Sequence, residues 1–411
     1  MKLKIKNQTA RIGVVGLGYV GLPLAVEFGM KFKTLGFDIN ETRIQELKAG
    51  IDHTLECSPE KLAKSGMLNF STDFRDLKAC EIYIITVPTP IDKNKTPDLR
   101  PLISATTTVG KVLDPGNLVI YESTVYPGLT EEILVPIIQK NTKFKLNKDF
   151  FLGYSPERIN PGDKKHTLKN THKILAIKSK NLLVKKRTIL IYKKITNKIV
   201  LTSNIKEAEM AKLVENVQRD INIAITNDIF LFSKKMGFDF KNIINLAATK
   251  WNFRKYNPGL VGGHCLPVDP YYLIDVAKRN SIKMRTVLSG RVTNNQIGKW
   301  AQKQIENKIR KNQNKRIYFL GITYKKNSSD TRNSMPLNIY KNLKKKYPNL
   351  YAVDQYCSMQ DKRKFKVLDE IKTYSKNCYY IFLLNHRNNI EIFKKIKKNK
   401  LDFYDPFGYF Q

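Results

Sequence analysis

Three glycines after an apolar segment constrain the fold of this chain more than any other sequence feature. Gly16, Gly18 and Gly21 form a GxGxxG pattern directly after RIGVV, a predicted strand, and at the start of a predicted helix. In that context the glycines allow a tight turn, and a pyrophosphate can then approach free N–H groups at the helix N-terminus. Tyr19 and Val20, between the glycines, are expected to contact the same ligand. The pattern predicts a dinucleotide-binding domain; the alternative is that the glycines merely close a turn.

An acidic residue indicates which dinucleotide is bound. Asp38 ends the next predicted strand, 22 positions beyond Gly16. A carboxylate there can accept hydrogen bonds from both ribose hydroxyls, and it would repel a 2′-phosphate. The sequence therefore favours NAD over NADP as the cofactor. Arg43 is the residue that would weaken this preference, because its charge could attract the phosphate.

Short apolar runs alternate with helical patterns in the first half of the chain. Such alternation is typical of βαβ units and a parallel sheet. The expected strands lie at residues 11–15, 34–38, 81–88, 117–123, 173–179 and 198–202. The expected helices lie at residues 19–32, 101–113 and 130–139.

A long helix is predicted next. From Lys206 to Met236 apolar residues recur near helical period, and no Pro or Gly interrupts them. A helix of about 30 residues is roughly 45 Å long, so it must pack against something, as a domain connector or a dimer seam. Beyond it, helices are expected at 271–279, at 293–310 and after Met335, and strands at 316–324, 349–354, 378–385 and 401–405.

These patterns define the fold class and the domains. We predict an α/β protein with two Rossmann-like parallel-sheet domains, joined by a long central helix and a helical dimerisation region. A length of 411 residues suits two or three domains. The predicted boundaries are residues 1–203 for an NAD-binding domain, 204–310 for the central region with a cysteine-bearing loop, and 311–411 for a C-terminal domain.

The charge of the chain is its unusual compositional feature. There are 73 Lys and Arg against 36 Asp and Glu, a net charge of +37, which suits an anionic partner or substrate. Nucleic acid is the first candidate, because counterion release favours clustered basic residues. The lysines are spread over the whole chain, however, and no run shows an aromatic-interleaved pattern. A solvated, lysine-rich surface is the better interpretation, and no nucleic-acid partner is expected.

Other patterns exclude further classes. The five cysteines are widely spaced without a CxxC pair, and the five histidines show no HxxxH spacing, so we expect neither a disulfide framework nor a bound metal. No apolar stretch approaches the roughly 18 residues needed to cross a bilayer. The glycines near the N-terminus also make a poor signal sequence. We expect a cytoplasmic protein without membrane insertion.

One cysteine is a candidate nucleophile. Cys265 lies in GGHCLPVD, where two glycines allow close ligand approach and Asp269 follows four residues later. A cysteine alone is more often a small buried apolar residue. In a dehydrogenase, however, a thiol can add to an aldehyde, and the thiohemiacetal then loses a second hydride to become a thioester. A cysteine protease with His264 as base is disfavoured, because sequential neighbours point apart.

Two polar residues on the long helix and one acid complete the candidates. Lys212 and Asn216 are spaced i, i+4 and share one helix face, where an ammonium and an amide can stabilise a developing oxyanion. In isolation a surface lysine beside a polar neighbour is the simpler interpretation of this pair. Glu157 follows a predicted strand end and could activate a water.

Together these motifs resemble the UDP-glucose/GDP-mannose dehydrogenase family, the nucleotide-sugar 6-dehydrogenases. The resemblance covers nearly the whole chain and is carried by RIGVVGLGYVGLPLA, GFDIN, YIITVPTPID, YESTVYPG, YSPERINPGD, EAEMAKLVEN, NPGLVGGHCLPVDPYYL and SDTRNS. It implies an N-terminal NAD domain, a central region that forms a homodimer, and a C-terminal domain that binds a UDP-sugar. It also implies that two NAD are consumed for each sugar oxidised from the C6 alcohol to the carboxylate.

Within that family, YSPERINPGDKKHTL and ENVQRDINIA resemble the branch that acts on UDP-N-acetylglucosamine or UDP-N-acetylgalactosamine. That branch supplies uronic acids to bacterial surface polysaccharides such as capsule or O-antigen. UDP-glucose 6-dehydrogenase is the closest alternative. A two-electron alcohol dehydrogenase and a non-catalytic nucleotide-binding protein are the others.

The resemblance also implies residue roles. Cys265 matches the nucleophile, with Lys212 and Asn216 at oxyanion-stabilising positions, and Asp269 matches the carboxylate after the nucleophile. The residues that order or activate water are Thr124 and Glu157. The implied cofactor contacts are Gly16, Gly18, Tyr19, Val20, Gly21, Asp38, Arg43, Thr89, Thr124 and Arg332. The implied substrate contacts are Glu157, Arg158, Lys212, Gly262 and Lys325.

Overall fold

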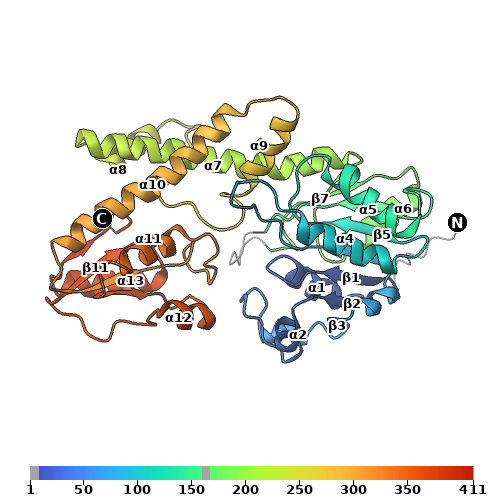
Figure 1. The fold of residues 1–411 in the computed structure, drawn as a ribbon, viewed down its shortest axis with the longest axis horizontal. Helices are drawn as coiled ribbons and strands as arrows, with labels where there is room; N and C mark the ends of the chain where they lie inside the picture. Colours follow the sequence, from blue (N-terminus) through green and yellow to red (C-terminus); the bar gives the residue numbers. More distant parts are fainter. Residues whose placement is uncertain (1–8, 160–166, 411) are drawn as a thin grey trace. The chain divides into compact units, whose positions relative to one another are not determined.

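The structure is a computed structural model that describes residues 9–159 and 167–410. It divides into two compact units (Figure 1). Unit 1 comprises Met1–Glu215 and Tyr271–Asn280, and unit 2 comprises Asn216–Pro270 and Ser281–Gln411. The division falls within α7 (Ile205–Met236), which is the long helix that the apolar periodicity predicts.

Unit 1 is built on a sheet of mostly parallel strands. Its strand order is β3-β2-β1-β4-β5-β6-β7-β8, and β6 and β7 form the antiparallel pair. The strands are β1 (Arg11–Val15), β2 (Lys33–Phe37), β3 (Leu68–Ser71), β4 (Ile82–Ile85), β5 (Leu118–Tyr121), β6 (Phe151–Tyr154), β7 (Lys173–Ile177) and β8 (Ile199–Thr202). The predicted α/β class with a parallel-dominated sheet is confirmed.

The central strands of this sheet are apolar along their whole length. Every residue of β4 and β5 is buried, as expected for parallel strands covered on both faces. The helices of unit 1 include α1 (Gly21–Gly29), α2 (Glu41–Lys48), α3 (Pro59–Ala63), α4 (Arg100–Val112), α5 (Val135–Thr142) and α6 (Leu182–Tyr192), with a 3-10 helix at Phe74–Ala79 and a π-helix at Thr130–Leu134. The core thus lies between this sheet and its helices.

The strand order of unit 1 creates a ligand-binding edge. β1 lies between β2 and β4, so the chain leaves β1 on one side and returns on its other side. In open α/β sheets, ligands bind at such a switch point, beyond the carboxyl ends of the strands. The glycine turn follows β1 at this edge, and the segments after β4, β5 and β6 carry Thr89, Thr124 and Glu157.

Unit 2 contains a second parallel sheet, as predicted. Its strand order is β10-β9-β11-β12. The strands are β9 (Arg316–Leu320), β10 (Leu350–Val353), β11 (Cys378–Phe382) and β12 (Phe403–Tyr404). The helices include α8 (Phe240–Ala247), α10 (Arg285–Arg310), α11 (Met335–Lys344), α12 (Met359–Phe365) and α13 (Arg387–Lys398), and α9 (Asp269–Arg279) begins in this unit.

The structure differs from the prediction in several elements: the strand ranges expected from the sequence include neither β3 nor β6, and one helix starts earlier than expected. α10 begins at Arg285, well before the expected start near residue 293. Its first turns bury Arg291 and Asn294, which bond to Asp220 of α7. Because polar residues occupy the buried face of these turns, the sequence lacks the apolar periodicity that would have predicted the helix there. Within the described ranges, no helix combines the length and apolarity needed to cross a membrane.

A buried carboxyl fastens the start of α7 to unit 1. Glu209 is fully buried, and its carboxylate accepts hydrogen bonds from the backbone N–H groups of Gly128 at 2.6 Å and Thr130 at 3.1 Å. Burial raises the pKa of Glu209 to about 7, although these hydrogen bonds oppose the shift. The folded protein therefore holds a proton on Glu209 at pH values where the unfolded chain has lost it.

This carboxyl should make stability pH-dependent. Because the pKa of Glu209 is raised on folding, its contribution is full below the unfolded pKa near 4.5 and is lost as the pH rises through about 7. The expected loss is about 3 kcal/mol. Glu209→Gln should abolish this part of the pH dependence in melting temperatures measured at pH 5.5 and 7.5, whereas Glu132→Gln, at an exposed site, should not. Parallel pH trends for wild type and Glu209→Gln would refute the assignment.

Candidate active site

The glycine turn of unit 1 has the geometry of a pyrophosphate cradle. Gly16 has a φ of +93°, and a Cβ added to Gly21 would lie 1.8 Å from the Gly16 carbonyl oxygen. The Thr86 hydroxyl donates to that same oxygen at 2.7 Å. At Gly18, by contrast, an added Cβ would meet no atom within 4 Å. The turn thus packs tightly against the protein at Gly21 and leaves free space at Gly18. This arrangement would allow a dinucleotide to approach the backbone at Gly18.

Asp38 stands at the end of β2, next to this turn. Its carboxylate accepts from the backbone N–H of Leu17 at 2.8 Å and of Asn40 at 2.9 Å. The residue is half-buried. These contacts fix it beside the glycine turn, at the place where ribose hydroxyls would bind.

Arg43 supports the turn from beneath. Its side chain is buried; Nε donates to the Leu17 carbonyl oxygen at 3.0 Å and Nη2 lies 2.8 Å from a carboxylate oxygen of Asp52. Burial raises the pKa of Asp52, but hydrogen bonds from Thr54 and Cys57 and the charge of Arg43 outweigh it and lower that pKa overall. The charge of Arg43 is therefore matched by a buried carboxylate within the protein.

Other predicted cofactor residues occupy the same edge of the sheet. Tyr19 and Val20 lie in the glycine turn and are half-buried. Thr89 and Thr124 lie in the segments that follow β4 and β5, and both are half-buried. The fold of unit 1 brings these residues to the end of the sheet where the glycine turn lies.

Glu157 is held at this edge by the backbone N–H groups of the two residues that follow it and by a lysine. Its Oε1 accepts from the backbone N–H groups of Arg158 and Ile159, both at 2.6 Å. Its Oε2 lies 3.5 Å from the ammonium of Lys173. The Arg158 guanidinium pairs with Glu215 at 3.0 Å. The rest of this sequence motif, residues 160–163, lies outside the described residues.

The i, i+4 pair on α7 is present as predicted. Lys212 and Asn216 are both buried on this continuous helix. The Lys212 ammonium lies 3.8 Å from a carboxylate oxygen of Glu215. The amide Nδ2 of Asn216 donates to Asp269 Oδ2 at 2.5 Å, within unit 2. Asn216 and Asp269 thus form one buried polar pair, which the sequence suggested only through their separate roles.

The cysteine loop turns into a helix immediately after Cys265. The Cys265 carbonyl oxygen accepts from the N–H groups of Val268 at 3.0 Å and Asp269 at 2.8 Å, and α9 begins at Asp269. A helical turn therefore connects Cys265 to Asp269. The thiol is therefore one turn before a buried, hydrogen-bonded carboxylate.

Cys265 also differs from the other cysteines in exposure. It is half-exposed, whereas Cys57, Cys80, Cys357 and Cys378 are buried. Burial raises the pKa of Cys57, Cys80 and Cys357 to about 12, so these thiols remain protonated. Cys265 is the cysteine whose position suits reaction with a ligand.

The loop before Cys265 packs against the segment that follows β9. A Cβ added to Gly262 would lie 2.9 Å from the Cβ of Tyr324. Gly263 has a φ of +86°, and a Cβ added there would lie 2.7 Å from the nearest ring atom of Tyr324. The Asn333 amide donates to the Gly263 carbonyl oxygen at 3.1 Å. Lys325, next to Tyr324, is half-buried in the same segment. Glycine is thus required here by close packing.

A charged cluster lies beside this contact. Asp330 is buried and bonds to Nε of Arg332 at 2.9 Å, and the ring of His264 lies 3.4 Å from its other oxygen. Burial raises the pKa of Asp330, but hydrogen bonds from His264 and Arg332 outweigh it, so that pKa lies well below its usual range. His264 therefore takes part in this cluster, which fits the expectation that it is not the base of a protease.

A buried polar network holds the start of the loop. The Asn227 amide bonds to both the carbonyl oxygen and the N–H of Gly259, at 3.1 and 2.9 Å, and also to Asn294. Asn294 and Arg291 bond in turn to Asp220 at 2.8 and 2.6 Å. Sequence reasoning missed this network, because its members come from three distant segments with no shared motif.

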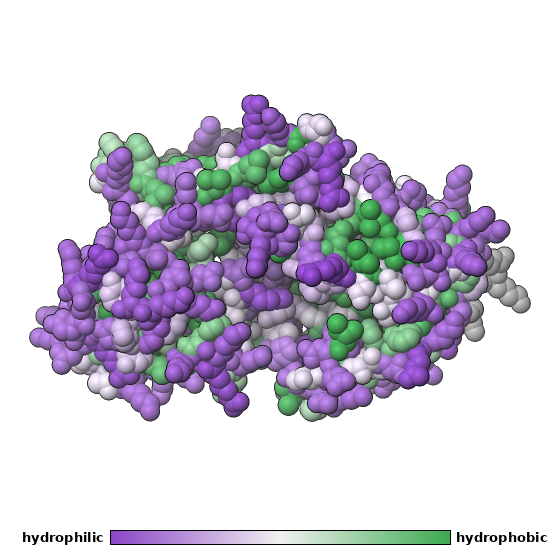
Figure 2. Space-filling model, in the orientation of Figure 1, coloured by the Kyte–Doolittle hydropathy of each residue, from purple (hydrophilic) through white to green (hydrophobic). Residues whose placement is uncertain are grey.

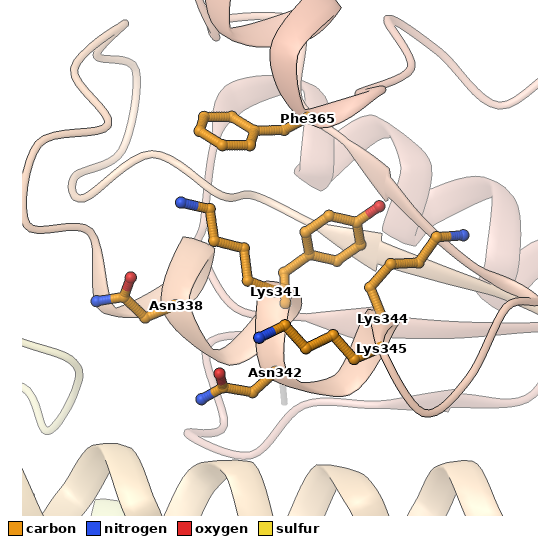
Figure 3. A pocket seen from close by; sticks show the side chains of 7 residues that line it. Asn338, Lys341, Asn342, Lys344, Lys345 and Phe365 are labelled. Carbon is orange, nitrogen blue, oxygen red and sulfur yellow. The ribbon is translucent and has the colours of Figure 1, made fainter.

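A separate pocket lies on the surface of unit 2. It has a volume of about 630 Å³ and is lined by Asn338, Tyr340, Lys341, Asn342, Lys344, Lys345 and Phe365 (Figure 3). The ammonium of Lys341 lies 4.3 Å from the centre of the Phe365 ring. None of the predicted site residues lines it, and its lysines match the basic surface found elsewhere on the chain.

Comparisons with known proteins identify the family of this chain. Models of the UDP-glucose/GDP-mannose dehydrogenase family match the chain in three parts: the NAD binding domain at residues 10–196, the central domain at 206–296 and the UDP binding domain at 318–407. The chain is 44% identical to the UDP-N-acetyl-D-glucosamine 6-dehydrogenase of Pseudomonas aeruginosa, over 85% of this chain and 84% of that protein. It is 42% identical to protein CapL of Staphylococcus aureus, over 92% and 91%.

A solved structure is similar along nearly the whole chain. The UDP-D-ManNAc dehydrogenase of Pyrococcus horikoshii aligns with a TM-score of 0.83 at 30% identity, over 98% of this chain and 96% of that one. The resemblance inferred from the motifs, the NAD-binding domain and the enzymatic class are thereby confirmed. The chain is a nucleotide-sugar dehydrogenase and belongs to the UDP-glucose/GDP-mannose dehydrogenase family.

Proposed function

We propose that this protein oxidises the C6 alcohol of a UDP-N-acetylhexosamine, UDP-N-acetylglucosamine or UDP-N-acetylgalactosamine, to the uronate in two NAD-dependent steps. The observation that carries the chemistry is the half-exposed Cys265, one turn before the buried pair formed by Asp269 and Asn216. The sugar assignment is supported by the names of the relatives in Pseudomonas aeruginosa and Salmonella typhi, both UDP-N-acetyl-D-glucosamine 6-dehydrogenases.

The proposed reaction begins with an alcohol. NAD, when bound, accepts one hydride from C6 in each oxidation. Lys212 and Asn216 donate hydrogen bonds to the oxygen on which negative charge develops. The Cys265 thiolate then adds to the aldehyde carbon, which keeps the half-oxidised sugar bound as a thiohemiacetal until the second oxidation yields a thioester.

Hydrolysis completes the cycle. A water held by Thr124 and activated by Glu157 attacks the thioester carbon, and Glu157 takes one of its protons. The C–S bond breaks to give the Cys265 thiolate and the uronic acid, which loses its remaining proton to solvent. Asp269 orients the Asn216 amide through the bond described above. Arg158, Gly262 and Lys325 are proposed to hold the UDP-sugar.

The cofactor contacts are proposed on the same basis. The open face at Gly18 receives the pyrophosphate, Asp38 binds the ribose, and Arg43 acts by holding the glycine turn from below. Tyr19, Val20, Thr89, Thr124 and Arg332 complete the proposed set. Because the charge of Arg43 is matched by Asp52, the preference for NAD over NADP should be retained.

A panel of UDP-sugars tests the substrate and the stoichiometry together. Purified protein with excess NAD should form about two NADH per molecule of UDP-N-acetylglucosamine or UDP-N-acetylgalactosamine, and mass spectrometry should detect the UDP-uronate. UDP-glucose and UDP-N-acetylmannosamine are the comparison substrates, because dehydrogenases of the latter are also relatives. Turnover of UDP-glucose alone would refute the proposed sugar, and one NADH with aldehyde accumulation would refute the four-electron reaction.

The uronate product is proposed to supply a bacterial surface polysaccharide. A UDP-uronate is an activated, anionic sugar donor, which is the form that glycosyl transfer requires. The similarity to protein CapL is consistent with a capsule or a related polymer.

We further propose that unit 2 mediates a homodimer. No residue of α8 is buried, although the helix is amphipathic, and Leu246 is 62% exposed. Phe232 and Met236 of α7 and Trp251 are also exposed, and Trp251 reaches 91%. Figure 2 shows apolar residues over α7 and α8, at the upper left of the view. An apolar surface of this kind favours a protein partner, here a second copy.

Charge placed on that surface should separate the copies. The double variant Phe232→Lys/Leu246→Lys should sediment as a monomer, whereas wild type should sediment at twice the chain mass of 47.5 kDa. Leu182→Lys, at an equally exposed leucine of unit 1, is the matched control and should leave the dimer intact. A wild-type monomer, or a dimer in the double variant, would contradict the proposal.

A further inference from the structure

A buried lysine lies at the ligand-binding edge of unit 1 because the last two strands of the sheet, β7 and β8, run opposite to the others. β7 runs antiparallel to β6, with Gly153 opposite Ile177 and Tyr154 opposite Ala176. The first residue of β7, Lys173, therefore lies beyond the carboxyl end of β6, where Glu157 follows. A parallel strand would have placed its last residue there instead.

The lysine is held by a buried acid and a buried phenol. The Lys173 ammonium lies 2.5 Å from Glu122 Oε2, and the Tyr192 hydroxyl donates to Glu122 Oε1 at 2.7 Å. Lys173, Glu122 and Tyr192 are each less than one-twentieth exposed. The ammonium position is thus fixed from the side of the protein core.

Glu157 is the partner on the other side of Lys173. Its side chain is 12% exposed, and its Oε2 is 3.5 Å from the ammonium. Two backbone N–H groups bind Oε1, and Lys173 is the cation that faces the second oxygen among the residues that the structure describes. The two nearby carboxylates raise the pKa of Lys173 despite its burial, which keeps the ammonium charged.

We propose that Lys173, fixed by Glu122 and Tyr192, is a positioning residue that orients Glu157 to take the proton of the hydrolytic water. The inference rests on the proposed function, because it assigns Lys173 to thioester hydrolysis and not to either oxidation. In that step a water oxygen bonds to the acyl carbon, one of its protons passes to Glu157, and the C–S bond breaks to release the Cys265 thiolate and the carboxylic acid, which then loses its remaining proton to solvent.

The test replaces both members of the buried ion pair, Lys173 and Glu122, by uncharged residues. Lys173→Met alone would leave Glu122 buried without its counter-ion, so the principal variant is Lys173→Met/Glu122→Gln. Both oxidations should proceed and hydrolysis should stall. We expect a burst of about two NADH per subunit, a steady-state kcat lowered about 10-fold to 100-fold, and a kcat/KM for the UDP-sugar within about threefold of wild type. Intact-protein mass spectrometry should show the uronyl adduct on Cys265.

Two variants separate positioning from folding. Lys178→Met/Glu131→Gln makes the same changes in a second ion pair, just beyond the other end of β7, whose lysine side chain is 52% exposed. This variant should leave kcat and the burst at wild-type values. Lys173→Arg keeps the charge and should recover most of the steady-state rate. A Lys173→Met/Glu122→Gln protein that melts like wild type and hydrolyses at the wild-type rate, without adduct, would overturn the proposal.

A third variant distinguishes this inference from the proposed function. Glu157→Gln should accumulate the same adduct. If Glu157→Gln accumulates the adduct and Lys173→Met/Glu122→Gln does not, the role of Lys173 is wrong and the reaction sequence stands. If wild type forms no NADH with any UDP-sugar, the proposed function itself fails.

Discussion

Replacing Cys265 by serine should lower uronate formation by at least about 1000-fold, because a hydroxyl is a far weaker nucleophile toward the aldehyde and forms no thioester. The change removes one sulfur atom from a half-exposed position, so the fold should be unaffected. The measurements are NADH formation and UDP-uronate detected by mass spectrometry. A Cys265→Ser enzyme that makes uronate at the wild-type rate would refute the covalent mechanism.

Alkylation of wild type provides an independent control for the same prediction. Iodoacetamide should modify Cys265 in the native protein and abolish activity in parallel. The buried Cys57, Cys80 and Cys357 should react only after unfolding, because burial raises their pKa values to about 12. Full modification of Cys265 with full retention of activity would argue against its role.

Replacing Gly18 by alanine should separate cofactor binding from folding. A Cβ at this position meets no protein atom within 4 Å, so the melting temperature should stay within about 2 °C of wild type. The added methyl group would occupy the open face where the pyrophosphate is proposed to approach the backbone. We expect the KM for NAD to rise at least about tenfold, measured by initial rates at saturating UDP-sugar.

The chain offers a matched glycine as the control. An added Cβ at Gly66 also meets no atom within 4 Å, but Gly66 lies in the exposed turn before β3, away from the glycine turn. Gly66→Ala should change neither stability nor the KM for NAD. An unchanged KM for NAD in Gly18→Ala would contradict the proposed approach of the cofactor.

The buried charged residues at the edge of unit 1 are Lys173 and Glu122, which lie beside Glu157. A lysine among two carboxylates and a phenol is costly to bury, and burial raises the pKa of Glu122. Such groups are seldom placed at the end of a sheet for stability alone, since apolar residues would pack there at least as well. Their position beside Glu157 is consistent with the proposed role in hydrolysis.

Several features followed from local sequence. The glycine turn, Asp38 at the next strand end, and the turn from Cys265 into Asp269 depend on residues close in the chain, whose conformational needs are visible in their types and spacing. The long helix and the alternating strands followed from apolar period in the same way.

Other features were decided by the tertiary structure. The antiparallel direction of β7 brought Lys173 to Glu122, 51 positions away, and no local pattern encodes that pairing. Asp52 took up the charge of Arg43, which the sequence left available to a phosphate. Ion pairs and buried polar networks depend on which segments pack together, whereas turns and helical periods depend on neighbouring residues; the sequence therefore determined the motifs, and only the fold decided their partners.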